Sequence, residues 1–153
     1  MTELFVDFIK TPIGLVEVKA NVKGLVSIAF IDEAERIGGN NSEHTDEAVK
    51  QLDEYFRGQR KTFSLNLDAN GTEFQESVWK ALVDVPYGET ASYGEIAKRI
   101  GKPKAMRAVG AANGRNPLAI VVPCHRIIGS TGKLVGYASG VDRKTFLLDL
   151  ESS

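Results

Sequence analysis

The side chains best suited to covalent chemistry are Cys124 and its neighbour His125. Cys124 is the only cysteine of the 153 residues, so the chain cannot form an internal disulfide or a cysteine-based zinc site. The thiol is either a small buried hydrophobe or a reactive group. An ordinary thiol, with a pKa of about 8.5, is mostly protonated at neutral pH and needs a base or a positive environment to react. His125 is the candidate base.

Adjacency in sequence does not by itself join the two side chains. Neighbouring side chains on a strand point to opposite faces, so the backbone must turn at Cys124 for His125 to act on it. The apolar run Leu118 to Val122 predicts a buried strand that ends at Pro123. The thiol is then expected where a strand gives way to a turn, a rigid position that can face a cleft. A structural thiol beside a surface histidine is the alternative.

Three helices are predicted before this strand. Thr72 and Gln75 form a capping box for a helix that runs to about Val83. Ser92 and Glu95 form a second box for a short helix that stops at Gly101. Pro103 suits the first turn of the next helix, which is expected to reach about Asn113 before Gly114. Two short helices joined by a tight turn predict a helix-turn-helix.

The second helix of this motif is built mainly from small residues, which are Ala105, Ala108, Gly110, Ala111 and Ala112. A helix with so little bulk can approach DNA closely, or it can pack tightly in the core. Arg107 is a long cation within it and is a candidate probe for entering DNA. Both interpretations of the small residues remain open from the sequence.

Positive charge is concentrated in one segment although the formal net charge is -1. Residues 96–141 contain no Asp or Glu, and they include Lys98, Arg99, Lys102, Lys104, Arg107, Arg115, Arg126 and Lys133. Such a cationic face can bind phosphates by releasing counterions. A solvated basic surface is the alternative.

The first half of the chain predicts a small antiparallel sheet and one helix. Strands are expected at Leu4 to Phe8, Leu15 to Ala20 and Leu25 to Ile31. Val49, Leu52, Tyr55 and Phe56 recur at helical spacing before Gly58, and a further strand is expected at Thr62 to Leu67. Asp68 to Gly71 is the predicted linker, which gives a β-rich domain at 1–70 and a second domain at 71–153.

Beyond these elements, Pro123-Cys124-His125-Arg126-Ile127-Ile128 resembles the active-site signature of the O6-alkylguanine-DNA alkyltransferases. Many separated positions in the same order extend the resemblance over residues 72 to 151. They are Phe74-Gln75, Val78-Trp79, Pro86, Gly88, Thr90, Ser92-Tyr93, Pro103, Arg107 to Gly110, Asn116-Pro117, Gly136-Tyr137, Gly140, Lys144, Leu147-Leu148 and Glu151. The implied fold class is α+β, with a small ribonuclease H-like N-terminal domain and a mostly helical, winged-helix-like C-terminal domain that carries the helix-turn-helix.

The resemblance also implies a role for each matching residue. Cys124 is the nucleophile, His125 takes its proton through a bridging water, and Glu151 orients His125. Asn116 braces the active-site turn, and Tyr93 hydrogen-bonds the flipped base and helps to protonate the leaving guanine. The implied substrate pocket consists of Tyr93, Ile127, Tyr137, Ala138 and Ser139. The implied DNA-binding residues are Lys104, Ala105, Arg107, Ala108, Gly110 and Arg115, with Arg107 filling the space left by the extruded nucleotide.

The implied activity is DNA repair by direct reversal, in which an alkyl group passes irreversibly from O6-alkylguanine to Cys124 in a single turnover. No cofactor or metal is implied: some relatives carry zinc in the first domain, but this chain has no cysteine there and only His44. Ala138 stands where several relatives have a larger or polar residue, which leaves the width of the pocket undetermined. The expected partner is double-stranded DNA containing O6-alkylguanine, with O4-alkylthymine as a further candidate lesion, and the protein is expected to act as a monomer, with cooperative DNA binding left open.

Three alternatives compete with this activity. An alkyltransferase-like protein binds the lesion without transfer, but such proteins lack the cysteine. A helix-turn-helix transcription regulator leaves Cys124, His125 and Glu151 without purpose, and a cysteine hydrolase predicts steady turnover. The N-terminus resembles no secretion signal and no apolar run approaches a membrane span, so the expected location is the cytoplasm, at the nucleoid, or the nucleus in a eukaryote.

Overall fold

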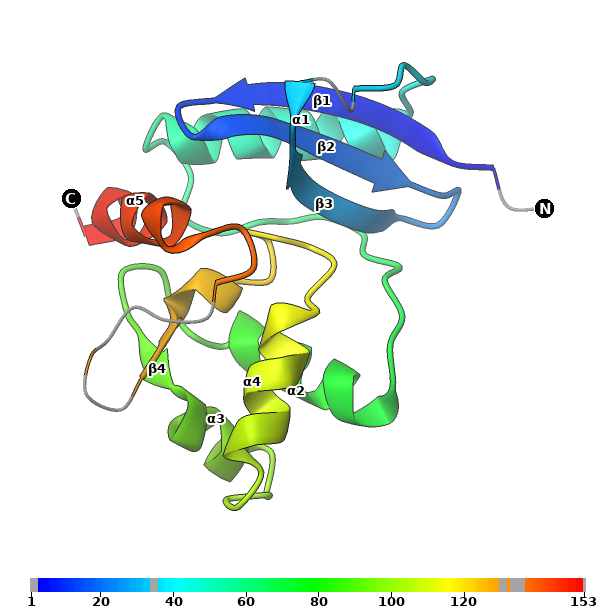
Figure 1. Cartoon of the computed structure of the whole chain (residues 1–153). Helices are drawn as coiled ribbons and strands as arrows, with labels where there is room; N and C mark the ends of the chain where they lie inside the picture. Colours follow the sequence, from blue (N-terminus) through cyan, green and yellow to red (C-terminus); the bar gives the residue numbers. More distant parts are fainter. Residues whose placement is uncertain (1–2, 34–35, 130–131, 133–136, 153) are drawn as a thin grey trace. The chain divides into compact units, whose positions relative to one another are not determined.

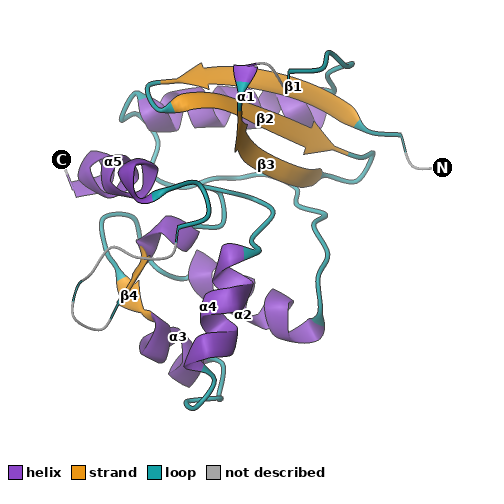
Figure 2. Ribbon diagram, viewed as in Figure 1, coloured by secondary structure: helices purple, strands orange, loops and turns teal. Residues whose placement is uncertain are grey.

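The computed structural model describes residues 3–33, 36–129, 132 and 137–152. The chain divides into two compact units (Figure 1). The first comprises Met1–Asn70 together with Pro117–Ala119, and the second comprises Gly71–Asn116 and Ile120–Ser153. Strands dominate the first unit and helices dominate the second (Figure 2). The predicted α+β class, with a small sheet-bearing N-terminal part and a mostly helical C-terminal part, is confirmed.

The first unit is built on the antiparallel sheet that the alternating apolar residues predict. Its strands are β1 (Phe5–Thr11), β2 (Gly14–Ala20) and β3 (Leu25–Ile31), in the order β1-β2-β3. Gly14 opens β2 after a two-residue turn that follows β1, and its φ of 128° is a conformation that favours glycine. Val16, Val18 and Ala20 alternate along the buried face of the central strand, as expected for a strand with one face in a core.

Helix α1 (Glu43–Phe56) packs against β1 and β2 and begins at a capping box formed by Ser42 and Thr45. Its buried apolar face is Ala48, Leu52 and Tyr55, so the predicted helix is confirmed. The predicted strand at Thr62 to Leu67 is wrong. Leu67 alone forms an isolated bridge to Leu25, because only the backbone of Asn66 and Asp68 hydrogen-bonds to β3 at that point.

In the second unit, both predicted capping boxes are present. Thr72 caps α2 (Glu73–Val83), and Ser92 caps α3 (Tyr93–Arg99), each with its reciprocal hydrogen bond. Such boxes satisfy backbone donors that a helix start leaves without partners. Gly101 follows α3 with a φ of 75°, the left-handed conformation expected of a glycine stop.

Helix α4 (Met106–Gly114) begins later than the sequence predicts. Pro103 lies not in its first turn but in the preceding turn, which is closed by the hydrogen bond from the Ala105 N–H to the Lys102 carbonyl. Proline is favoured at the second position of such a turn because its ring already holds the required φ. The connection between α3 and α4 therefore spans residues 100–105.

The predicted buried strand at Leu118 to Val122 is also wrong, although every residue of the run except the half-buried Val121 is buried. Leu118 forms only an isolated bridge to Ile28 of the first unit. Ile120 has a φ of 73°, which a β-branched residue adopts only in a constrained turn. A short apolar run cannot reveal this conformation, because burial in a turn and burial in a strand give the same pattern.

The chain then forms the one-turn helix η2 (Cys124–Arg126), strand β5 (Ile127–Ile128) and the final helix α5 (Val141–Ser152). Strand β5 pairs in parallel with β4 (Ala91–Ser92). This pairing joins the start of α3 to the segment that follows Cys124. Among the described residues, no helix is both long and apolar enough to cross a membrane.

Candidate active site

Cys124 opens the turn η2, so the backbone turns where the chemistry requires it. The Cys124 N–H donates to the Val122 carbonyl at 2.8 Å. The side-chain amide of Asn116 donates to the same carbonyl, also at 2.8 Å, and the amide of Asn113 donates to the Cys124 carbonyl at 3.4 Å. Asn116 therefore holds the backbone at Val122, two residues before Cys124, and its role as a brace of the turn stays a prediction.

The Cys124 thiol lies in an environment that opposes its ionisation by burial and assists it by hydrogen bonding. Cys124 is only 7% exposed to solvent. Burial raises the pKa of the Cys124 thiol, whereas the Asn116 side chain, the backbone N–H groups of Cys124 and His125, and the Lys144 charge lower it. The thiol is the resting form, and donors that favour the thiolate are already in place around it.

His125 is completely buried and is paired with Glu151. The distance from His125 Nε2 to Glu151 Oε2 is 2.6 Å. Burial lowers the pKa of His125, and the Glu151 hydrogen bond and charge only partly oppose this effect. A neutral imidazole beside a carboxylate carries its proton on Nε2, so Nδ1 has the lone pair. Within the described residues, no protein group hydrogen-bonds to Nδ1.

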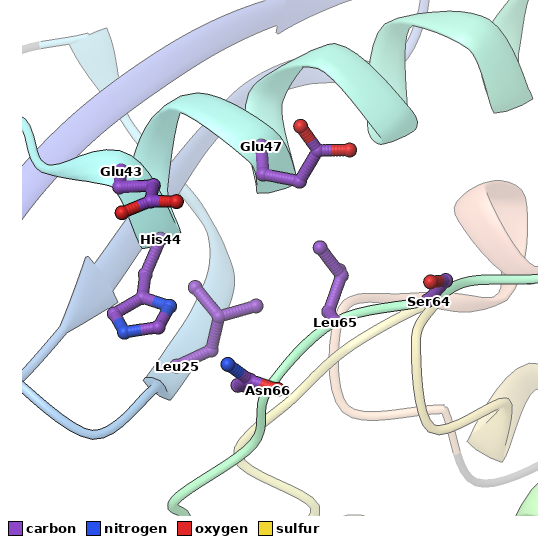
Figure 3. A pocket seen from close by; sticks show the side chains of 7 residues that line it. All are labelled: Leu25, Glu43, His44, Glu47, Ser64, Leu65 and Asn66. Atoms are coloured by element: carbon purple, nitrogen blue, oxygen red, sulfur yellow. The ribbon is translucent and has the colours of Figure 1, made fainter.

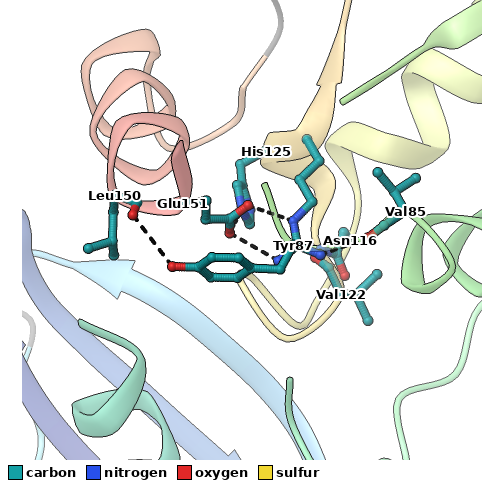
Figure 4. Close-up of polar contacts among 8 residues, drawn as sticks. Val85, Tyr87, Asn116, Val122, His125, Leu150 and Glu151 are labelled. Carbon is teal, nitrogen blue, oxygen red and sulfur yellow. Dashed lines mark hydrogen bonds and ion pairs between the residues drawn. The ribbon is translucent and has the colours of Figure 1, made fainter. Parts of the chain in front are cut away.

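Arg126 completes a buried cluster with Glu151. Its Nε donates to Glu151 Oε1 at 2.7 Å and its Nη2 donates to Oε2 at 3.0 Å, while Nη1 donates to the Val85 carbonyl at 2.8 Å. The guanidinium carbon also lies 5.7 Å from the centre of the Tyr87 ring. Figure 4 shows Glu151, carried by α5, meeting His125, with Tyr87 reaching the Leu150 carbonyl beside it.

Two tyrosines lie near the thiol. Tyr93 is the first residue of α3, and Tyr137 is buried near the start of α5. Burial raises the pKa of both phenols, and the charge of an ionised Cys124 raises each further. That coupling places both phenols within electrostatic reach of the sulfur. The β4–β5 pairing explains this for Tyr93, because it holds the start of α3 beside the segment after Cys124.

The remaining expected pocket residues differ in exposure. Ile127 is fully buried, and its carbonyl accepts a hydrogen bond from the buried Lys144 ammonium. Ser139 is half-buried and its carbonyl accepts from Arg143 at 3.3 Å, whereas Ala138 is exposed. Gly136, which also belongs to the motif, lies outside the described residues.

Helix α4 has two faces. Its buried face is Val109, Ala112 and Asn113, and the Trp79 indole N–H of α2 donates to the Ala112 carbonyl at 2.8 Å. Its exposed side includes Arg107, Ala108 and Ala111. The small residues therefore pack in the core on one face, and on the other face they leave a surface with few protruding side chains.

The six expected DNA-binding residues are distributed over these faces. Four of them are exposed, namely Lys104, Arg107, Ala108 and Arg115, and Ala105 is half-buried at the start of the helix. Gly110 is half-buried, and a side-chain carbon added there would lie 3.8 Å from the Tyr93 ring. Gly110 thus lets α4 pass close to the start of α3.

A separate pocket of about 380 Å³ lies in the first unit (Figure 3). Its polar lining includes Glu43, His44 and Glu47 of α1, with Asn66 on the facing segment. His44 Nε2 lies 3.2 Å from the Val22 carbonyl, and Glu47 accepts from Gln51 at 2.8 Å. Across the residues described, no group of three His, Cys, Asp or Glu side chains is placed to hold a metal ion.

Sequence reasoning assigned no separate role to several groups of the site. Arg126 and Lys144 belong to the motifs quoted above, but nothing in their spacing indicates that they are buried beside Glu151 and Cys124. Asn113 was expected only as a helix end, yet it reaches the Cys124 carbonyl. A basic residue buried next to a nucleophile is visible only once the segments have packed.

The fold and the site together define a DNA alkyltransferase architecture, and comparison with known proteins leads to the same class. The family model described as "6-O-methylguanine DNA methyltransferase, DNA binding domain" matches residues 73–153, and the model described as its "ribonuclease-like domain" matches residues 4–69. A protein of Methanosarcina barkeri named methylated-DNA–protein-cysteine methyltransferase is 52% identical over 155 residues, which cover 98% of each chain.

Solved structures agree with this match. The crystal structure of Mycobacterium tuberculosis O6-methylguanine methyltransferase is similar with a TM-score of 0.88 and 45% identity, over 98% of this chain and 93% of that one. A structure of the M. tuberculosis protein in complex with DNA has a TM-score of 0.86 and 48% identity, over 95% and 91% of the two chains. The chain belongs to the 6-O-methylguanine DNA methyltransferase family.

Proposed function

We propose that this protein repairs DNA by direct reversal, transferring an alkyl group from O6-alkylguanine in double-stranded DNA to Cys124. One observation carries the proposal. The only cysteine is buried next to His125, which is itself paired with Glu151 at 2.6 Å, in a unit that also exposes the small-residue helix α4. Membership of the family and the DNA complex of a relative support the same activity.

The chemistry follows from the site. The Cys124 sulfur attacks the alkyl carbon, a carbon–sulfur bond forms, and the bond from that carbon to guanine O6 breaks with its electron pair on oxygen. The thiol proton passes to His125 Nδ1, through a bridging water as the resemblance implies. The leaving guanine takes up one proton, for which the Tyr93 hydroxyl is the proposed donor, and the proton held by His125 restores Tyr93 through solvent, so that one proton is lost by the thiol and one is gained by guanine. Nucleophile, base and orienting carboxylate act as a set.

The alkyl carbon is not accessible to a buried thiol while the guanine is stacked in the duplex, so the nucleotide must be extruded. Extrusion costs a few kcal/mol. Arg107 on the exposed side of α4 offsets part of this cost by occupying the vacated stack, and the low surface of Ala108 and Ala111 lets the helix approach the minor groove. Lys104, Arg115 and the other exposed cations contact phosphates.

The product is a thioether, in which water finds no good leaving group, so each molecule reacts once. The test is mass spectrometry after incubation with excess duplex DNA containing O6-methylguanine. One added methyl is expected on the Cys124 peptide, with a burst equal to the protein concentration and no subsequent turnover. Cys124→Ala is expected to bind the DNA and accept nothing.

The same experiment separates the rival activities. Sustained turnover would indicate a hydrolase, and methyl on another residue would remove Cys124 as the acceptor. Preference for a DNA sequence over a lesion in a gel shift, with no transfer, would indicate a transcription regulator. O4-alkylthymine DNA, offered in parallel, tests whether the pocket accepts the second lesion.

A further inference from the structure

The Arg126 side chain is the least expected component of the site. A long cation in an otherwise basic segment is normally solvated, but Arg126 is only 6% exposed and its guanidinium makes three buried hydrogen bonds within the described part of the protein. Two of these bonds reach both oxygens of Glu151, and the third reaches the Val85 carbonyl. Bidentate pairing of this kind fixes both partners in a single orientation.

Glu151 therefore has two partners, because its carboxylate accepts hydrogen bonds from His125 and from Arg126 at the same time. The oxygen Oε2 is shared, at 2.6 Å from His125 Nε2 and 3.0 Å from Arg126 Nη2. A carboxylate that faced His125 alone would strongly favour the imidazolium ion. With Arg126 on the other side, the pair of Glu151 and Arg126 carries no net charge, and a neutral imidazole is the complementary partner.

We propose that Arg126 is a positioning residue for alkyl transfer, which fixes Glu151 and balances its charge so that His125 stays neutral and can accept the Cys124 proton at Nδ1. This inference rests on the proposed function. Arg126 touches neither the nucleophile nor the alkyl carbon in this assignment. It acts through Glu151, and its effect is on the proton affinity of His125.

The two cations near His125 both favour its neutral form. After burial, which lowers the pKa of His125 most, Glu151 raises it, and Arg126 of η2 and Lys144 of α5 lower it. Tyr87, from the turn after α2, faces the same cluster, and burial raises the pKa of its phenol, so that it stays neutral. Among the described residues, Glu151 is the only anion whose charge acts on His125, and Arg126 is its direct counter-charge.

The test compares Arg126→Met with Arg126→Lys. Methionine keeps much of the side-chain volume but removes the charge, while lysine keeps a charge and loses the bidentate geometry. The rate of thioether formation with free O6-benzylguanine is measured against pH, since the free base needs no DNA. Arg57→Met is the matched control, because Arg57 also pairs with a carboxylate, that of Asp53 at 2.9 Å, but on the exposed surface of the first unit.

With Arg126→Met, the acid limb of the pH profile is expected to move to higher pH. A displacement of about one unit corresponds to a rate about tenfold lower at any pH below the limb. With Arg126→Lys, the limb is expected near its wild-type position with a lower plateau. Arg57→Met is expected to reproduce the wild-type profile. An unmoved limb in Arg126→Met, or identical losses at every pH in the two Arg126 variants, overturns the proposal.

Imidazole nitrogen NMR keeps the test decisive if Arg126→Met does not fold. The chain has only two histidines, so His44→Gln assigns both sets of signals. Wild-type His125 is expected to be neutral at pH 7, with its proton on Nε2. A doubly protonated wild-type His125 overturns the role of Arg126. If the wild-type protein transfers no alkyl group while His125 is neutral, the proposed function fails and the charge balance stands.

Discussion

Replacing Glu151 with glutamine is the most informative single change in the site. The carboxylate accepts three N–H groups, one from His125 and two from Arg126. An amide has a single acceptor oxygen and adds two donors of its own. At least one of the three N–H groups then loses its acceptor or faces another donor, and the Arg126 charge is left buried without compensation.

The magnitude follows from this burial. Removing one partner of a buried, hydrogen-bonded ion pair costs about 3–5 kcal/mol. For a chain of this length, that corresponds to a fall in melting temperature of about 6–20 °C. The transfer rate is expected to fall by about 10²–10⁴-fold, as for the loss of an orienting carboxylate behind a histidine base.

The assay combines thermal unfolding with single-turnover transfer from O6-methylguanine duplex DNA, followed by mass spectrometry of the Cys124 peptide. Glu54→Gln is the matched control. Glu54 accepts from Arg60 at 2.9 Å, but both side chains are partly exposed. Such a pair contributes about 0–1 kcal/mol, and it belongs to the first unit, whereas Cys124 belongs to the second.

Two results would refute the reasoning. Wild-type transfer rates in a folded Glu151→Gln protein would remove Glu151 from the mechanism. A loss of stability no larger than that of Glu54→Gln would mean that the buried cluster does not carry the expected energy. DNA binding is measured alongside and is expected to persist, because Glu151 is a buried residue of α5 and is not part of the exposed side of α4.

Three further outcomes are expected. Arg107→Ala should slow repair of duplex DNA much more than reaction with free O6-benzylguanine, because the free base needs no extrusion; equal losses on both substrates would place Arg107 in the chemistry. Burial raises the pKa of Cys124, so the folded state holds a proton that the unfolded state releases above about pH 8.5. The free energy of unfolding should therefore fall as pH rises, by up to about 1.4 kcal/mol per pH unit more than in Cys124→Ser. Free energies from urea unfolding in reductant that change in parallel for the two proteins between pH 8 and 10 would contradict this. Gly24→Ala should lower the melting temperature, because the added carbon would lie 2.5 Å from the Asn66 carbonyl oxygen; an unchanged value would show that the backbone there yields freely.

Local signals in the sequence predicted the elements that local physics controls. The capping boxes at Thr72 and Ser92 start helices where they were expected, because the bonds they form involve residues three apart. Alternation of apolar residues similarly predicted β1, β2 and β3. The two wrongly predicted strands were Thr62 to Leu67 and Leu118 to Val122, where each segment contributes one bridge residue to a neighbour far along the chain.

The sequence by itself determined the three-stranded sheet and α1 of the first unit, helices α2, α3 and α4 of the second, the small-residue character of α4, and the motif in which Cys124, His125 and Arg126 are consecutive. The resemblance implied that Glu151 orients His125, but only the tertiary structure decided that Glu151 also pairs with Arg126. These residues are 26 and 25 positions apart, and no local periodicity encodes a distance between the last helix and an earlier turn. The charge balance of the site is therefore a property of packing, since buried ions are tolerated only where the fold supplies their partners.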